Sequence, residues 1–161
     1  MTNTQLPVNA SLEDAKKMLR ENWDEGVNCP ACTQLVKKYE RKLNTGITLF
    51  LIGLYRIEPE GINYHHAKEV LEKIGAFTTS RDYSILEYWK LIEPELNTDE
   101  EKRTSGFWKI TQLGRDFVEG KETVLSHAMI FNNKGYGLTG EPIDIRTSLV
   151  NKFNYEELMQ S

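Results

Sequence analysis

Cysteine is scarce in this chain. The 161 residues contain only two, Cys29 and Cys32, which are separated by two residues. A small secreted domain held together by disulfides carries more cysteines at wider spacing. Residues 1–10 are polar and lack the apolar centre of a signal peptide. We therefore expect a cytoplasmic protein whose fold does not depend on disulfides.

Long apolar runs are also missing. The most apolar stretch, 47–55, is nine residues long and contains Gly53, whereas a membrane-spanning helix needs about 20 residues. Glycine and proline are few, at 11 and 5 residues, and hydrophobic residues make up 39% of the chain. This is the composition of a globular protein. We expect a flexible tail over 1–10 and a single domain over 11–161.

Charge is unevenly distributed along a chain whose formal net charge is −4. Residues 33–56 contain five basic residues and one acidic residue, a balance of +4. Residues 57–101 contain four basic and eleven acidic residues, a balance of −7. The overall acidity argues against broad non-specific binding to nucleic acid, because phosphates are repelled at long range. A local basic face remains compatible with this balance.

Helical periodicity dominates the first half of the chain. Ser11 before Leu12, with acidic residues following, is typical of a helix start. The run 47–57 is apolar nearly all round, which predicts a central buried helix. Apolar residues at helical spacing predict the remaining helices, which together are expected at 11–26, 31–44, 47–57, 64–74 and 81–90. Those within 11–44 would form N-terminal helices ahead of the central one.

The pattern changes to short strands in the second half. Strands are predicted at 91–93, 106–110, 124–131 and 142–145, and a capped helix at 112–118. The stretch 132–140 contains three glycines and predicts turns. A final helix is expected at 147–159, so that 121–161 would form a C-terminal β/helix extension. Six large apolar residues are predicted to be buried: Leu51, Leu54, Leu71, Leu86, Trp89 and Trp108.

Two segments resemble the winged helix-turn-helix family. Residues 85–92, ILEYWKLI, resemble the end of a recognition helix that runs into the first wing strand. Residues 106–118, GFWKITQLGRDFV, resemble the second wing strand and the capped helix after it. The resemblance covers about 45–120 and implies a mainly α fold with a small β-wing. The CPAC segment, 29–32, resembles uncharacterised phage and bacterial proteins that contain CPxC.

The winged-helix resemblance implies a DNA-binding surface. The recognition helix would be 81–90 and the wing loop would lie within 94–105. Arginine can read guanine, while serine, tyrosine and lysine can contact phosphate. The candidate DNA-binding residues are Lys37, Lys38, Arg41, Lys42, Arg81, Ser84, Tyr88, Lys90, Lys102 and Arg103. Asp82 and Glu87 share the recognition helix, and such a mixed surface also suits a protein partner.

The two cysteines admit three interpretations. Zinc binds Cys-x-x-Cys pairs but takes about four ligands in structural sites. The others could come from His65, His66 or His127, or from the thiols of a second chain. A dithiol redox site needs a lowered thiol pKa, although the strand–helix pattern of a thioredoxin fold is absent here. The third interpretation is a pair of reduced cysteines in a turn.

No segment carries a catalytic motif. The chain has no phosphate-binding loop, nucleophile elbow or His-Glu metal motif, so we expect no enzyme activity. The sequence favours a dimeric, sequence-specific DNA-binding protein that acts as a transcriptional regulator, with Zn²⁺ as its one candidate cofactor. The alternative is a non-enzymatic protein-binding module, such as a phage-encoded inhibitor of a host or defence protein. Neither hypothesis involves a membrane.

Overall fold

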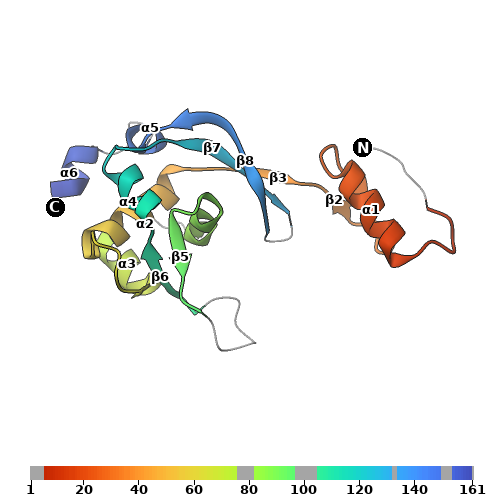
Figure 1. The fold of residues 1–161 in the computed structure, drawn as a ribbon, viewed down its shortest axis with the longest axis horizontal. Coiled ribbons are helices and arrows are strands. Elements are labelled where there is room, and N and C mark those ends of the chain that lie inside the picture. The colour runs from red at the N-terminus through yellow and green to blue at the C-terminus, as the bar shows by residue number, and fades with distance from the viewer. Residues whose placement is uncertain (1–5, 76–81, 97–104, 132–133, 150–153, 161) are drawn as a thin grey trace. The chain divides into compact units, whose positions relative to one another are not determined.

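The computed structural model describes residues 6–75, 82–96, 105–131, 134–149 and 154–160. Helices and several small antiparallel sheets make a mixed α/β structure (Figure 1). Its contacts group into two compact units. Unit 1 comprises Met1–Arg41 with Met129–Tyr136, and unit 2 comprises Lys42–Ala128 with Gly137–Ser161. The strand content exceeds that of the mainly α fold expected from the sequence.

Within the described residues, no helix is long and apolar enough to cross a membrane.

Unit 1 begins with helix α1, Leu12–Asn22, whose N-terminus matches the prediction. Ser11 accepts from the backbone N–H of Asp14, and the Asp14 carboxylate accepts from that of Ser11. This reciprocal capping satisfies two N–H groups that the helix itself leaves unpaired. The buried apolar side chains of the unit are few, with Met18 and Val27 at 4% and 1% exposure.

A β-hairpin follows α1 in place of the predicted second helix. Strands β1, Val27–Asn28, and β2, Leu35–Val36, pair antiparallel, and β3, Tyr39–Lys42, comes next. The helix predicted over 31–44 is therefore wrong. Leu35 and Tyr39 have helical spacing, but both side chains are exposed, so their spacing does not mark a buried face. Backbone pairing between β1 and β2 decides the local structure instead.

Helix α2, Thr45–Ile57, is the centre of unit 2. All residues from Ile47 to Leu54 are buried, as its nearly continuous apolarity predicts. Asn44, expected to be part of a break, caps the helix by accepting from the N–H of Ile47 at 3.1 Å. The elements that contact α2 include α3, Ala67–Ile74, the 3₁₀ helix η2, Asp82–Trp89, and α4, Gln112–Val118.

A small sheet accompanies these helices. Its strands are β4, His65–His66, β5, Ile92–Pro94, and β6, Phe107–Ile110. The spatial order is β4-β6-β5, and both pairs are antiparallel; β5 and β6 lie side by side in Figure 1. The predicted helix over 64–74 thus starts later, because its first residues pair with β6.

The start of α4 packs closely against the junction between η2 and β5. Thr111 caps α4 by accepting from the N–H of Gly114, and its hydroxyl donates to the carbonyl of Lys90 at 2.6 Å. A Cβ at Gly114 would lie 2.2 Å from the backbone oxygen of Leu91 and 2.7 Å from the Ile110 side chain. Only glycine allows this approach.

A third sheet contains β3, β7, Val124–Phe131, and β8, Lys134–Ile143, in the order β3-β7-β8. The bounds of β7 match the prediction, whereas most of the turn-rich stretch expected at 132–140 belongs to β8. Gly140 explains the difference, since a Cβ there would lie 2.1 Å from the Ser126 hydroxyl. Gly140 therefore marks a close approach between β7 and β8 rather than a turn. Two short helices end the chain, α5, Ile145–Leu149, and α6, Tyr155–Gln160.

The predicted core is largely confirmed. Leu51, Leu54, Leu86, Trp89 and Trp108 are 0–1% exposed. The remaining residue, Leu71 on α3, is half-buried. The indole N–H of Trp89 donates to the carbonyl of Leu125 at 2.7 Å, so its one polar group is satisfied inside the core.

Replacing Gly114 by alanine tests the close approach of α4. In an ordinary helix interior, Gly→Ala stabilises by up to about 1 kcal/mol. Here we expect Gly114→Ala to lower the free energy of unfolding by about 1–3 kcal/mol, because the added methyl overpacks the contact. Urea unfolding measures the change, and Gln112→Ala on the exposed face of α4 is the control. A stabilised Gly114→Ala protein would contradict this packing.

Truncating Trp89 tests the core beneath η2. Trp89→Ala should lower the free energy of unfolding by about 3–5 kcal/mol, because it leaves a large cavity. Leu96→Ala is the matched control, since Leu96 is 92% exposed and surface substitutions usually change stability by no more than about 0.5 kcal/mol. Similar urea midpoints for the two variants would show that Trp89 is not a core residue.

Candidate functional site

The CPAC segment forms the loop of the β1–β2 hairpin. The Cys29 N–H donates to the carbonyl of Gln34 at 2.8 Å, and the Thr33 N–H donates to the carbonyl of Cys29 at 2.9 Å. Thr33 has a φ of 65°, a left-handed conformation that is uncommon for a β-branched residue. Cys29 is half-buried, Cys32 is exposed, and neither forms a disulfide. The loop therefore holds two thiols on one tight turn.

The backbone of this loop favours the thiolate of Cys29. Hydrogen bonds from the backbone N–H groups of Cys32 and then Ala31 hold the pKa of the Cys29 thiol below its ordinary value. Burial acts in the opposite direction, and a hydrogen bond from the Cys32 side chain adds to the lowering. The thiolate is both the nucleophile and the metal ligand of cysteine chemistry. This loop is thus suited to metal binding or thiol reactivity.

The histidines proposed as further ligands have other partners. His65 lies 3.8 Å from carboxylate oxygens of Glu58 and Glu69. His66 caps α3 by accepting from the Lys68 N–H at 3.1 Å. Across 6–75, 82–96, 105–131, 134–149 and 154–160, no group of three or more Cys, His, Asp or Glu residues could hold a metal ion.

His127, the third histidine, makes a hydrogen bond of 2.6 Å between its Nδ1 and the hydroxyl of Ser126.

The predicted basic helix face does not exist. Lys37 and Lys38 lie between β2 and β3, while Arg41 and Lys42 are neighbours on β3, where successive side chains point to opposite faces. Lys38 forms an ion pair with Asp24 at 2.7 Å, and its Nζ lies 5.3 Å from the centre of the Trp23 ring. Because the helix is absent, these four cations do not share one helical face.

The region expected to read DNA is mixed in charge. On η2, Ser84 and Tyr88 are half-buried, and Glu87 is exposed. Lys90 follows η2 with an exposed side chain and a φ of 59°. Three predicted DNA-binding residues lie outside the described residues: Arg81, Lys102 and Arg103. The described part of this surface therefore offers one exposed cation, Lys90, and two exposed acids, Asp82 and Glu87.

Strands β5 and β6 are joined by an ion pair. Lys109 on β6 lies 3.0 Å from the carboxylate of Glu93 on β5, directly opposite it in register. The hydrogen bond to Glu93 is the main cause that raises the pKa of Lys109. The Lys109 ammonium also lies 4.9 Å from the centre of the Tyr64 ring. These contacts fix the cation against the sheet rather than extending it outward.

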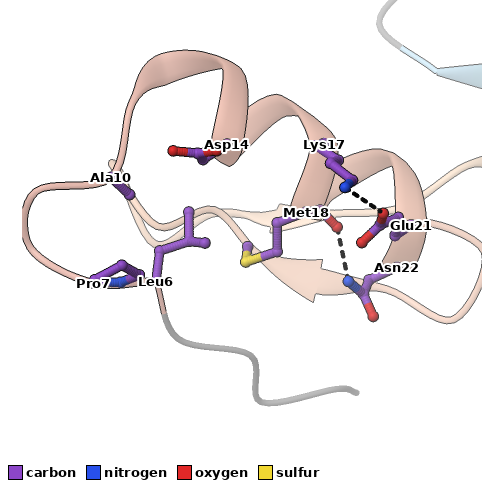
Figure 2. A pocket seen from close by; sticks show the side chains of 8 residues that line it. All are labelled: Leu6, Pro7, Ala10, Asp14, Lys17, Met18, Glu21 and Asn22. Carbon is purple, nitrogen blue, oxygen red and sulfur yellow. Dashed lines mark hydrogen bonds and ion pairs between the residues drawn. The ribbon is translucent and has the colours of Figure 1, made fainter.

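A separate hollow of about 410 Å³ lies beside α1 in unit 1 (Figure 2). The figure shows Met18 and Leu6 facing each other across it, with charged side chains around them. Lys17 lies 3.8 Å from Glu21, and Asp14 takes part in the helix cap. The charged side chains that line the hollow thus make contacts within α1 and its N-terminal cap. The full lining is Leu6, Pro7, Ala10, Asp14, Lys17, Met18, Glu21 and Asn22.

Comparisons with family models, curated proteins and solved structures find no match to this chain.

Sequence reasoning found the two thiols but missed their setting. Thr33 and Gln34 close the loop, but the helix predicted over 31–44 assigns them no role. A signal was present, since the thiols are flanked by two short pairs that each contain a valine, Val27–Asn28 and Leu35–Val36, and valine favours strands. Short pairs of this kind on both sides of a loop are consistent with a hairpin.

Titration of a single thiol tests the loop geometry. In Cys32→Ser, the backbone N–H groups around Cys29 remain, so we expect thiolate absorbance to appear with a midpoint below the usual value of about 8.5. The same variant unfolded in urea is the control and should titrate near about 8.5. Metal-free protein is used in both arms. Identical midpoints in the folded and unfolded protein would contradict the hydrogen bonding to Cys29.

Proposed function

We propose that this chain is a DNA-binding regulator in which residues 45–118 act as a winged-helix unit. The observation that carries the proposal is the order of the elements, α2, β4, α3, η2, β5 and β6, together with the strand order β4-β6-β5. In a winged helix the same arrangement places three helical elements and a short strand before a β-hairpin wing. By this correspondence, η2 is the recognition element and β5–β6 is the wing.

The polar side chains of η2 support contacts to a duplex. Ser84 and Tyr88 can donate hydrogen bonds to phosphate, and Lys90 supplies a positive charge at the end of the element. The left-handed backbone of Lys90 directs the chain out of η2 and into β5. Phosphate contacts fix register and orientation, whereas base contacts give specificity. We therefore assign Lys90 a phosphate-contacting role.

A protein-binding module is the second candidate. Leu96, which follows β5, and Phe107, which begins β6, are 92% and 38% exposed. The exposed acid Glu95 adjoins both, since it precedes Leu96 and its N–H donates to the carbonyl of Phe107 at 2.9 Å. Exposed apolar side chains beside an acid suit a protein surface better than phosphate. If the DNA experiment fails, a protein partner would be sought. Loss of binding to that partner in Phe107→Ser would support this function.

Salt dependence and a Lys90 variant test DNA binding. Binding to a fluorescein-labelled duplex, first random and then selected from a library, is followed by anisotropy at several salt concentrations. The logarithm of the affinity should fall linearly with the logarithm of salt, by about 0.9 for each phosphate neutralised. Lys90→Gly should weaken all duplexes similarly and reduce this slope by about one contact. Glycine is chosen because it adopts the left-handed backbone without strain.

Lys121→Ala is the matched control, because it removes the same charge from a lysine already paired with Glu119 at 2.6 Å. It should leave affinity and salt slope close to those of the unmodified protein. Absence of binding by folded protein at low salt would overturn the proposed function. Equal losses in the two lysine variants would overturn the role of Lys90.

A further inference from the structure

The CPAC hairpin supplies half of a tetrahedral thiolate site. Structural zinc sites are almost always four-coordinate, and their cysteines come in Cys-x₂₋₄-Cys pairs. Cys29 and Cys32 have this spacing on one loop. The sequence contains no other cysteine, and the described residues of unit 1 provide no third ligand beside them. The described part of unit 1 therefore brings two ligands where four are needed.

We propose that Zn²⁺ joins two copies of this chain, each of which contributes Cys29 and Cys32 to a shared four-cysteine site. The proposal rests on the hairpin of unit 1 and is independent of DNA binding. The shared site would produce a homodimer that forms only when Zn²⁺ is bound.

The loop is already arranged for two metal bonds. The hydrogen bonds of Cys29 with Gln34 and Thr33 hold its backbone in a closed turn. The N–H groups of Ala31 and Cys32 are directed at the Cys29 sulfur. Such bonds orient a ligand and distribute the negative charge of a metal-bound thiolate. The site therefore requires little rearrangement of this copy.

Exposure near the thiols makes room for a second copy. Cys32 is exposed, and Leu35, which begins β2 just beyond the loop, is 49% exposed. An apolar side chain in this position gains by burial against another chain. The cation Lys37 follows β2 in the sequence and can offset the negative charge of a four-thiolate zinc centre. Thiol, apolar and basic groups thus lie on one short segment.

The chemistry needs no oxidant or reductant. Four thiols bind one Zn²⁺, and each sulfur loses one proton to the solvent as its bond to the metal forms. The resulting centre has a formal charge of −2. Metal binding also stabilises the folded state, and among the described residues of unit 1 only Met18 and Val27 are buried apolar side chains.

Metal content and mass test the shared site in the full-length protein. Protein purified with zinc and without chelator should contain about half a zinc ion per chain and have the mass of a dimer by light scattering. EDTA should convert it to a monomer, and added Zn²⁺ should restore the dimer. Co²⁺ titration into the metal-free protein should saturate at the same ratio, with the sulfur-to-cobalt bands of a tetrahedral thiolate site.

Cys29→Ser/Cys32→Ser should bind no zinc and remain monomeric, while circular dichroism reports whether it is folded. Thr33→Ser is the control, since it keeps both thiols and the backbone N–H. A monomer with one zinc ion per chain would overturn the shared site. So would a dimer that persists in EDTA, or a metal-free protein in which Cys29 and Cys32 oxidise to a disulfide. The cobalt titration of unmodified protein keeps the test decisive if the double variant does not fold.

Discussion

Unit 2 depends on the burial of α2. A helix that is apolar nearly all round must be covered on every side, because each exposed apolar surface costs free energy in water. Helices α3, α4, α5 and α6, the 3₁₀ helix η2 and strand β6 all contact it. The antiparallel sheet β4-β6-β5 is thereby kept beside the helices. The proposed recognition element and wing owe their positions to this one helix.

Close backbone contacts complete that arrangement. Gly114 allows α4 to approach the carbonyl of Leu91, and Thr111 ties the start of α4 to Lys90. These contacts fix the point where η2 ends and β5 begins. The left-handed backbone of Lys90 is held at this junction, so a local strain is maintained by its surroundings. An element proposed to contact DNA is thus attached rigidly to the core.

Unit 1 is stabilised differently, since it has little buried apolar surface. A reciprocal cap holds the start of α1, and Trp23 packs against the rings of Phe131 and Tyr136, with centroids 5.2 and 4.9 Å apart. The hairpin of the cysteines belongs to this same unit. A small unit of this kind gains more from a metal than a unit with a large core does. This contrast gives the proposed zinc site a structural reason as well as a chemical one.

The sequence alone determined the elements whose signals are local or strongly periodic. The Ser11 cap, the buried helix near 47–57, the bounds 112–118 and 124–131, and most of the core follow from capping residues and apolar spacing. Only the tertiary structure decided the segment 31–44 and strand β8. Leu35 and Tyr39 have helical spacing, but both side chains are exposed. Gly140 predicts a turn from the sequence, whereas in the structure it allows a close approach to Ser126. Pairing between strands outweighs local preference in both places, so the four cations share no helical face and the two thiols lie on a defined loop.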